Sequence, residues 1–332
     1  MVAAVADGSL GAMAPPPAAS GRALPGGIEV VDHLDADRAA AVTALLSGLR
    51  AAGVPTVNDG HADALEDLRA GRDGAVACLV GADPLTAYGQ LVRTPAGWEV
   101  AVVPTGAAAA ADILAALAGA AAARGGGPMR WWVAGATGDS DRLAAAAGMT
   151  AERTLLQLRC PLPLPAGTAG SGPVPATRPF DPDRDVPGWL ACNNRAFAGH
   201  PEQGGWDEAT FARRRAASWF DPGDLLVAEE GGRIIGSCWT KLHPGPPVAG
   251  EIYVIGVDPS AQGRGLGRGL TVAGLAHLVD RGATEGLLYV DASNAAALAL
   301  YASLGFVEHR RDRCYLMDVV GEDGQRATTA RS

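Results

Sequence analysis

The sequence predicts an α/β fold, with mixed sheets of the α+β kind, in two tandem domains. The chain has 332 residues, which is about twice the usual length of a single domain. Proline and glycine are concentrated at residues 160–179, where neither a helical nor a strand period can continue. Strand and helix patterns recur on both sides of this segment. We therefore expect a first domain over residues 28–160, a linker over 161–175 and a second domain over 176–320.

Composition and charge narrow the kind of partner that the protein binds. The net charge of -9 disfavours nucleic acid, whose phosphates attract basic surfaces, and favours a neutral or cationic small molecule. The five cysteines form no Cys-x-x-Cys pair, so neither a disulfide framework nor a metal site is expected. No run of residues approaches a membrane span. We expect a cytoplasmic monomer, with a disordered leader over residues 1–27 and a disordered tail over 321–332.

The second half has the clearer pattern of secondary structure. Apolar β-rich runs are separated by turn residues, and two segments repeat their apolar residues at helical spacing. The expected order is a hairpin, a strand, a helix, a strand, a helix and a closing strand. The expected strands are 224–230, 233–242, 251–257, 286–291 and 313–320, and the expected helices are 267–281 and 294–304.

The first half repeats this order more faintly. Glu99 and Gly148 are about as far apart as Glu251 and Gly305 in the second half, which indicates an ancient duplication. The segment TGAAAAA at residues 105–111 stands where the second half has a glycine loop, so we expect no acetyl transfer in the first half. The expected strands are 75–80, 85–92, 98–104, 130–135 and, as the closing strand, 155–160, and the expected helix is 107–123.

A glycine-rich loop lies between strand 251–257 and helix 267–281. Glycines in this position let backbone N–H groups converge on an anion, and the N-terminus of the following helix adds a partial positive charge. Arg264 and Arg268 supply further charge at the rim. The loop matches neither a Rossmann nor a P-loop pattern, because the required third glycine and the Gly-Lys pair are absent. The sequence therefore predicts a site for a phosphate-bearing compound of another kind.

Two motifs together resemble the GCN5-related N-acetyltransferase (GNAT) superfamily. Gln262-x-x-Gly265-x-Gly267 after a strand resembles the pyrophosphate signature of that family, and residues 294–306 resemble its C-terminal signature. The resemblance implies two tandem GNAT-like domains, splayed strands that leave a cleft, and acetyl-CoA as the acetyl donor. The implied acetyl-CoA contacts are the backbone of Ile255, Gly256 and Val257 for the pantetheine arm, the loop Gln262, Gly263, Arg264, Gly265, Leu266, Gly267 and Arg268 for the pyrophosphate, and Asn294 beside them.

Acetyl transfer to an amine requires a neutral amine, a polarised thioester carbonyl and a proton for the departing thiolate. Glu251, at the start of the strand beside the expected cleft, is the candidate base. Tyr301, in the C-terminal signature, is the candidate acid, as the family resemblance implies. The alternative interpretations are a solvated charge at a strand end for Glu251 and a tyrosine packed on the sheet for Tyr301.

A closer resemblance, to the mycothiol synthases within that superfamily, rests on residues 196–206, 239–244 and 251–259. It implies transfer of acetyl to the cysteinyl amine of cysteinyl-glucosaminyl-inositol. His200 and His243 lie in the same segments, where an imidazole near a cleft could serve as a base or hydrogen-bond donor, although a lone loop histidine is more often solvated. Two alternatives stay open: another N-acetyltransferase of the same fold, and an acyl-CoA-binding sensor without catalysis. The implied substrate contacts are Asp59, Glu202, Lys241, Glu251 and Tyr289.

Overall fold

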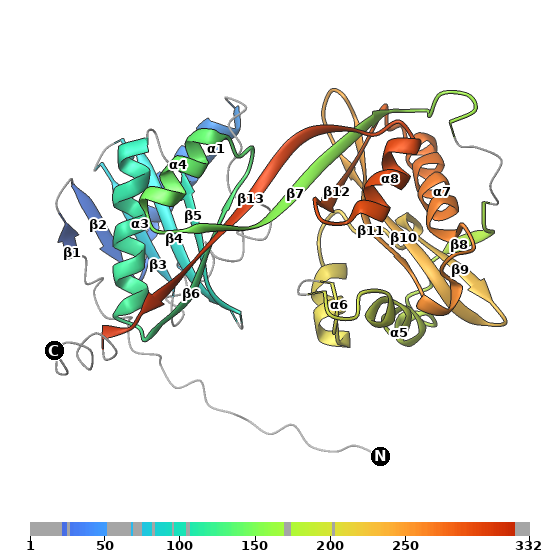
Figure 1. Cartoon of the computed structure of the whole chain (residues 1–332), viewed down its shortest axis with the longest axis horizontal. Coiled ribbons are helices and arrows are strands. Elements are labelled where there is room, and N and C mark those ends of the chain that lie inside the picture. The colour runs from blue at the N-terminus through green and yellow to red at the C-terminus, as the bar shows by residue number, and fades with distance from the viewer. Residues whose placement is uncertain are drawn as a thin grey trace, which may run out of the picture. The chain divides into compact units, whose positions relative to one another are not determined.

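The computed structural model divides the chain into two compact units (Figure 1). The first unit takes residues 1–152 and 313–332, and the second takes residues 153–312. The expected leader lies largely outside the described residues, but its residues 22–24 form a strand. The structure describes residues 22–24, 27–51, 68, 75–81, 84–94, 96–103, 107–168, 174–200 and 203–322.

The first unit is a mixed sheet with helices packed on it. Its strands are β1 (Arg22–Leu24), β2 (Ile28–Val31), β3 (Val76–Val80), β4 (Ala87–Thr94), β5 (Gly97–Val103), β6 (Gly126–Val133) and the later part of β13 (Val307–Val320), and its helices are α1 (Ala36–Ala51), α3 (Ala107–Ala122) and α4 (Gly138–Ala146). The strand order is β1-β2-β3-β4-β5-β6-β13, and only β5 and β6 pair in parallel. Helix α3 lies against this sheet (Figure 1), because Ile113, Leu114 and Leu117 form one buried face.

The second unit has the same plan. Its strands are β7 (Thr150–Pro161), which begins in the first unit, β8 (Thr177–Pro179), β9 (Leu225–Glu230), β10 (Arg233–His243), β11 (Ala249–Val257) and β12 (Glu285–Asp291), and its helices are α5 (Val186–Ala196), α6 (Glu208–Arg215), α7 (Leu266–Asp280) and α8 (Ala295–Ser303). The strand order is β7-β12-β11-β10-β9-β8. Strands β9 to β11 are antiparallel and β11 pairs with β12 in parallel, as β3 to β6 do in the first unit. This shared arrangement supports the predicted duplication.

Both faces of the second sheet are partly covered. Helix α7 packs closely on one face, where a Cβ at Gly250 would lie 2.8 Å from the Leu278 side chain. The same face carries an apolar core that includes Ile252, Leu275 and Leu288. On the other face, α5 and α6 bring together an aromatic cluster, whose largest members are Trp189, Trp206, Phe211 and Trp239.

The two closing strands differ from the sequence prediction. Residues 155–160 are predicted to close the first half, but in β7 they pair with β12, from Leu155 opposite Asp291 to Cys160 opposite Gly286. Residues 313–320 are predicted to close the second half, but they pair with β6 of the first unit. Both segments are long strands whose backbone groups are satisfied by either partner, so side-chain contacts far apart in sequence decide the pairing.

Most other predicted elements are confirmed, with bounds that differ by one to a few residues. Strands β3 to β6 and β9 to β12, and helices α3, α7 and α8, all lie where the sequence predicts them. Helices α1, α4, α5 and α6 and the short strands β2 and β8 were not predicted. The α/β fold class in two tandem units is therefore confirmed, while four helices and the exchange of closing strands are additions from the structure.

Candidate active site

The sheet of the second unit opens into a cleft between β11 and β12. The two strands pair in parallel as far as Ile252 and Leu288. Beyond that point β11 continues to Val257 and β12 to Asp291, with no further pair between them in the described chain. A β-bulge at Tyr253 shifts the register with β10 by one residue and bends the strand. The predicted splaying of these strands is confirmed, and it leaves a cleft of about 700 Å³.

Four of the predicted site residues line this cleft. Ile255 lies on the unpaired edge of β11 and Tyr289 lies on β12. Asn294 caps the N-terminus of α8, where its side chain accepts a hydrogen bond of 3.1 Å from the Ala297 N–H. Tyr301 of α8 is the fourth predicted residue in the wall. The remaining walls come from the end of α5, from the following loop and from β12. They include four residues that the sequence did not single out: Phe197, Gln203, Asp291 and Ser293.

The glycine loop leads from β11 into α7. Gly263 and Gly265 have φ of +74° and +77°, a conformation that side chains other than glycine rarely adopt. Gly265 is the N-cap of α7, so the free N–H groups of the first helical turn point into the loop. A Cβ on either glycine would meet nothing within 4 Å, so the space beside the loop is open. The geometry fits an anion, and glycine is required here by the backbone conformation.

Both arginines of the loop have partners of their own. Arg264 pairs with Glu230 at 2.6 Å, and both side chains are about half exposed. Arg268 donates hydrogen bonds to the Ser303 hydroxyl at 2.5 Å and to the Thr168 carbonyl at 2.7 Å. Arg268 therefore ties the start of α7 to the end of α8 as well as contributing charge.

Asp258 fixes the segment that precedes the loop. Its buried carboxylate accepts hydrogen bonds from the Ser260 hydroxyl and N–H at 2.6 Å and 3.0 Å and pairs with Arg195 of α5 at 2.6 Å. These hydrogen bonds, that from the Ser260 hydroxyl above all, lower the pKa of Asp258 to about 2 although its desolvation acts in the opposite direction. A local signal for this role is present in the sequence, because aspartate before proline is typical of a turn, and Asp258 caps the short helix Pro259–Ala261.

The sheet register brings polar side chains together on the face opposite α7. Residues that lie opposite each other in neighbouring strands point to the same face. One row of paired residues crosses four strands. Glu251 of β11 lies opposite Lys241 of β10 on one side and opposite Leu287 of β12 on the other. Leu287 in turn lies opposite Arg159 of β7. Tyr289 follows Leu287 on the same face. The predicted residues Lys241, Glu251 and Tyr289, distant in sequence, thus share one face.

Glu251 is buried and hydrogen-bonded to His243. Only 7% of Glu251 is exposed, and its Oε2 lies 2.6 Å from Nε2 of His243. The alternative of a solvated strand-end charge is therefore wrong, and His243 is a hydrogen-bond partner of this carboxylate rather than a lone solvated imidazole. Register explains the contact, because His243 lies opposite Ala249, two residues from Glu251 on the same face.

The Tyr289 hydroxyl receives two hydrogen bonds. Gln157 of β7 donates from Nε2 at 2.6 Å, and Arg310 of β13 donates at 3.1 Å. Arg310 is held in turn by the buried Asp312 at 2.8 Å. Burial raises the pKa of Tyr289, so the phenol stays protonated at neutral pH. Sequence reasoning missed Gln157 because it assigned that strand to the first half.

Tyr301 both packs in the core and lines the cleft. It is 6% exposed and makes an edge contact with Phe306, with ring centroids 5.7 Å apart. Burial raises its pKa to about 12. Its role as an acid stays a prediction, and the protonated phenol in the cleft wall is compatible with it.

Lys241 is held over aromatic rings. Its Nζ lies 4.7 Å from the ring centroid of Trp219 and 5.8 Å from that of Tyr253. Such cation–π contacts fix the direction of a flexible side chain. The cluster of aromatic rings on this face therefore orients a cation beside Glu251.

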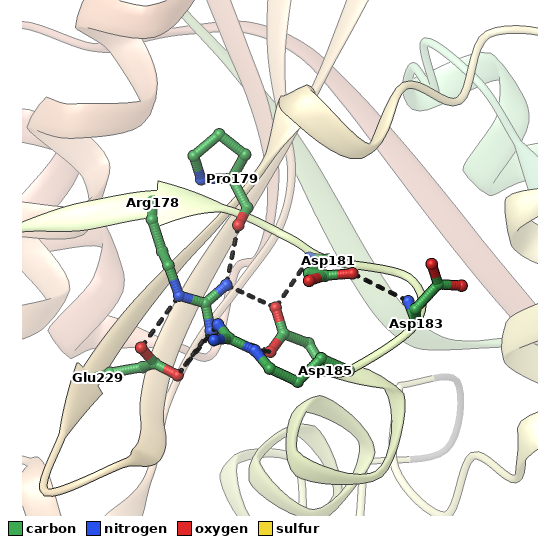
Figure 2. A network of polar contacts seen from close by, with 7 residues as sticks. Arg178, Pro179, Asp181, Asp183, Asp185 and Glu229 are labelled. Carbon is green, nitrogen blue, oxygen red and sulfur yellow. Dashed lines mark hydrogen bonds and ion pairs between the residues drawn. The ribbon is translucent and has the colours of Figure 1, made fainter.

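A network of charges anchors α5, whose end forms one wall of the cleft (Figure 2). Arg178 of β8 donates to both oxygens of Asp185 at 2.5 Å and 2.9 Å and to Glu229 of β9 at 2.5 Å. Figure 2 shows the guanidinium of Arg178 between the two carboxylates, and Asp185 also accepts from the Asp181 N–H at 2.8 Å. Because Asp185 is the N-cap residue of α5, the network fixes the start of that helix on the sheet.

Two predicted substrate contacts, Asp59 and Glu202, lie outside the described residues. Among the residues that the structure describes, no three His, Cys, Asp or Glu side chains gather as a metal site would need. None of the described helices combines the length and apolar character needed to cross a membrane.

Comparison with known proteins gives matches to one family. The acetyltransferase (GNAT) family matches residues 190–306. The mycothiol acetyltransferase of Thermomonospora curvata is 52% identical over 191 residues, 57% of this chain and 63% of that protein. The mycothiol acetyltransferase of Thermobispora bispora is 48% identical over 193 residues, 56% of this chain and 65% of that protein. Both matches therefore span less than two thirds of those relatives. The mycothiol acetyltransferase of Streptomyces avermitilis is 39% identical over 300 residues, 87% of this chain and 94% of that protein.

Solved structures share the fold. A GCN5-related N-acetyltransferase from Sphaerobacter thermophilus has a TM-score of 0.64 at 20% identity, covering 90% of this chain and 97% of that one. A tandem GNAT protein from the clavulanic acid biosynthesis pathway has a TM-score of 0.64 at 15% identity, covering 89% of this chain and 100% of that one. These structures confirm the predicted tandem GNAT-like fold.

Proposed function

Because this chain belongs to the mycothiol acetyltransferase family, we propose that it moves an acetyl group from acetyl-CoA to the cysteinyl amine of cysteinyl-glucosaminyl-inositol. This reaction completes mycothiol. The observation that carries the proposal is the buried carboxylate of Glu251 at the point where β11 and β12 separate, with the glycine loop at the far end of β11. A donor laid along the free edge of β11 would have its phosphates at the loop and its reactive end near Glu251.

The residues of the second unit fit acetyl-CoA in two places. The edge of β11 from Ile255 to Val257 has backbone groups that no strand pairs on the cleft side in the described chain, which suits the amides of pantetheine. The first turn of α7 and the loop Gln262 to Arg268 offer N–H groups and open space to a pyrophosphate. Bound acetyl-CoA supplies an acyl group activated as a thioester.

Glu251 acts first in the proposed mechanism. It attracts the substrate ammonium and takes one proton from it, directly or through water, which leaves a neutral amine. The amine nitrogen then bonds to the acetyl carbon while backbone N–H groups on the free edge of β11 stabilise the charge on the carbonyl oxygen. The nitrogen loses a second proton, and Tyr301 gives one to the departing thiolate. One proton in all passes to solvent for each acetyl group transferred.

The polar face around Glu251 suits a sugar-inositol substrate. Tyr289, with two donors already on its oxygen, presents its O–H to an acceptor, and Lys241 presents a charge held over Trp219. Asp59 and Glu202 remain predicted contacts. A cytoplasmic, monomeric enzyme without a metal also stays a prediction.

One experiment separates the proposal from its alternatives. The protein is incubated with acetyl-CoA and a panel of cysteinyl sugars, simple amines and peptides, and the release of free CoA is followed. We expect kcat/KM to be highest for cysteinyl-glucosaminyl-inositol. A preference for a peptide or another amine would indicate a different N-acetyltransferase, and binding of acetyl-CoA without turnover on any amine would indicate a sensor.

A further inference from the structure

His243 is hydrogen-bonded to Glu251, with 2.6 Å between Nε2 and Oε2. An ionised carboxylate only accepts hydrogen bonds, so Nε2 carries the proton and donates it. The His243 side chain is 36% exposed and that of Glu251 only 9%, so the imidazole lies between the carboxylate and solvent.

We propose that His243 is a positioning residue for Glu251. By holding Oε2, the imidazole fixes the carboxylate and leaves Oε1 to receive the proton of the substrate ammonium. The inference rests on the proposed role of Glu251 as the base. Without His243 the carboxylate would lose a charge-assisted hydrogen bond and with it a single defined orientation.

Two substitutions test the positioning role. His243→Leu removes the donor, and we expect kcat to fall by about tenfold or more while KM for acetyl-CoA stays within about twofold. His243→Gln keeps an N–H donor, and we expect it to recover most of the lost kcat.

A second histidine–carboxylate pair in the same unit provides the matched control. His277 of α7 lies 2.7 Å from Asp224, with 23% and 6% of their side chains exposed, and neither belongs to the proposed catalytic or binding residues. His277→Leu removes the same kind of hydrogen bond without touching Glu251, so kcat should not change. The melting temperature and the calorimetric affinity for acetyl-CoA of every variant show whether it is folded.

The outcomes are distinct. Full kcat in His243→Leu, a His243→Gln variant no better than His243→Leu, or an equal loss in His277→Leu would each overturn the positioning role. Glu251→Gln separates this inference from the proposed function. If Glu251→Gln is fully active, the assignment of the base is wrong. If Glu251→Gln is inactive and His243→Leu is fully active, only the inference about His243 fails.

Discussion

Gln157 of β7 donates a hydrogen bond of 2.6 Å to the hydroxyl oxygen of Tyr289 on the neighbouring strand β12. Arg310 donates a second at 3.1 Å, and the Oε1 of Gln157 accepts from Arg159 at 3.0 Å. A phenol oxygen that accepts two hydrogen bonds has its own proton left to donate. The arrangement therefore orients Tyr289 as a donor toward the cleft, through residues that lie outside the two GNAT motifs.

Gln157→Leu should weaken binding of the sugar substrate. The substitution keeps the volume of the side chain but removes the donor, so the Tyr289 hydroxyl loses its orientation. We expect KM for the amine substrate to rise about fivefold to tenfold, with kcat and KM for acetyl-CoA little changed. The matched control is Gln90→Leu in the first unit, where Gln90 is also buried and accepts from the Tyr88 hydroxyl at 2.7 Å. An equal rise in KM for both variants would contradict the role of Gln157.

Glu251→Gln should abolish most turnover and leave binding of acetyl-CoA intact. The amide is isosteric with the carboxylate and can still contact His243, but it cannot take a proton or attract the ammonium. We expect kcat to fall by about a hundredfold or more. Steady-state kinetics and calorimetry with acetyl-CoA measure the two effects separately, and an unchanged kcat at neutral pH would refute the base.

Tyr301→Phe should slow departure of the thiolate. The raised pKa of Tyr301, about 12, follows from its burial and keeps the phenol protonated throughout the neutral range, as an acid requires. We expect kcat to fall by about tenfold to a hundredfold with little change in affinity for acetyl-CoA. Because the ring packs on Phe306, melting temperatures are needed as well. A large loss of stability with full activity per folded molecule would indicate a packing role alone.

Asp185→Asn should destabilise the fold in a manner that depends on pH. Burial by itself raises the pKa of Asp185, but the hydrogen bonds, chiefly those from Arg178, outweigh it and lower the pKa to about 2. A lowered pKa stabilises the folded state fully above the unfolded value of about 4, and this contribution is lost as pH falls toward 2. We expect a loss of about 2 kcal/mol at pH 6 that shrinks as the pH falls. The exposed Asp183→Asn is the control, and a loss independent of pH would contradict the charge-based account.

The sequence predicts the parts of the site that depend on local signals. Gly263 and Gly265 have a backbone conformation that glycine favours, and Glu251 is the one charged residue of the apolar segment that forms β11. The sequence alone therefore indicates both features. The partners His243 and Gln157 could not, because their contacts depend on register between strands. A hydrophobic pattern indicates which face of a strand is buried, but it does not determine which strand pairs with it.

The same limit applies to the helices and closing strands that the sequence analysis missed or misassigned. Helix α5 carries Trp189 and Leu190 beside Pro187 and Gly188, which weakens any helical period in its first turn. Its position depends on Arg178 and the aromatic cluster. Strands β7 and β13 have similar lengths, 12 and 14 residues. Their partners are distinguished by tertiary contacts, such as Tyr315 against Trp131 with ring centroids 5.5 Å apart.

The exchange of closing strands determines which part of the chain folds alone. A fragment of residues 176–332 follows the sequence prediction of the second domain but lacks β7. It would expose the edge of β12 and lose Gln157 and four residues of the apolar core, Leu156, Leu158, Cys160 and Leu162. It would also keep residues 313–320 without their partner β6, which leaves an unpaired strand prone to association.

A fragment of residues 153–312 contains the whole second unit and should behave differently. Each buried aliphatic side chain contributes about 1.5–3 kcal/mol to stability. Because fragment 176–332 lacks β7, its free energy of unfolding should be several kcal/mol lower than that of fragment 153–312. We expect 153–312 to unfold cooperatively and to bind acetyl-CoA by calorimetry, and 176–332 to aggregate or to unfold at a much lower denaturant concentration. Equal stability and equal affinity in the two fragments would mean that β7 is dispensable, and that the pairing of β7 with β12 does not stabilise the cleft.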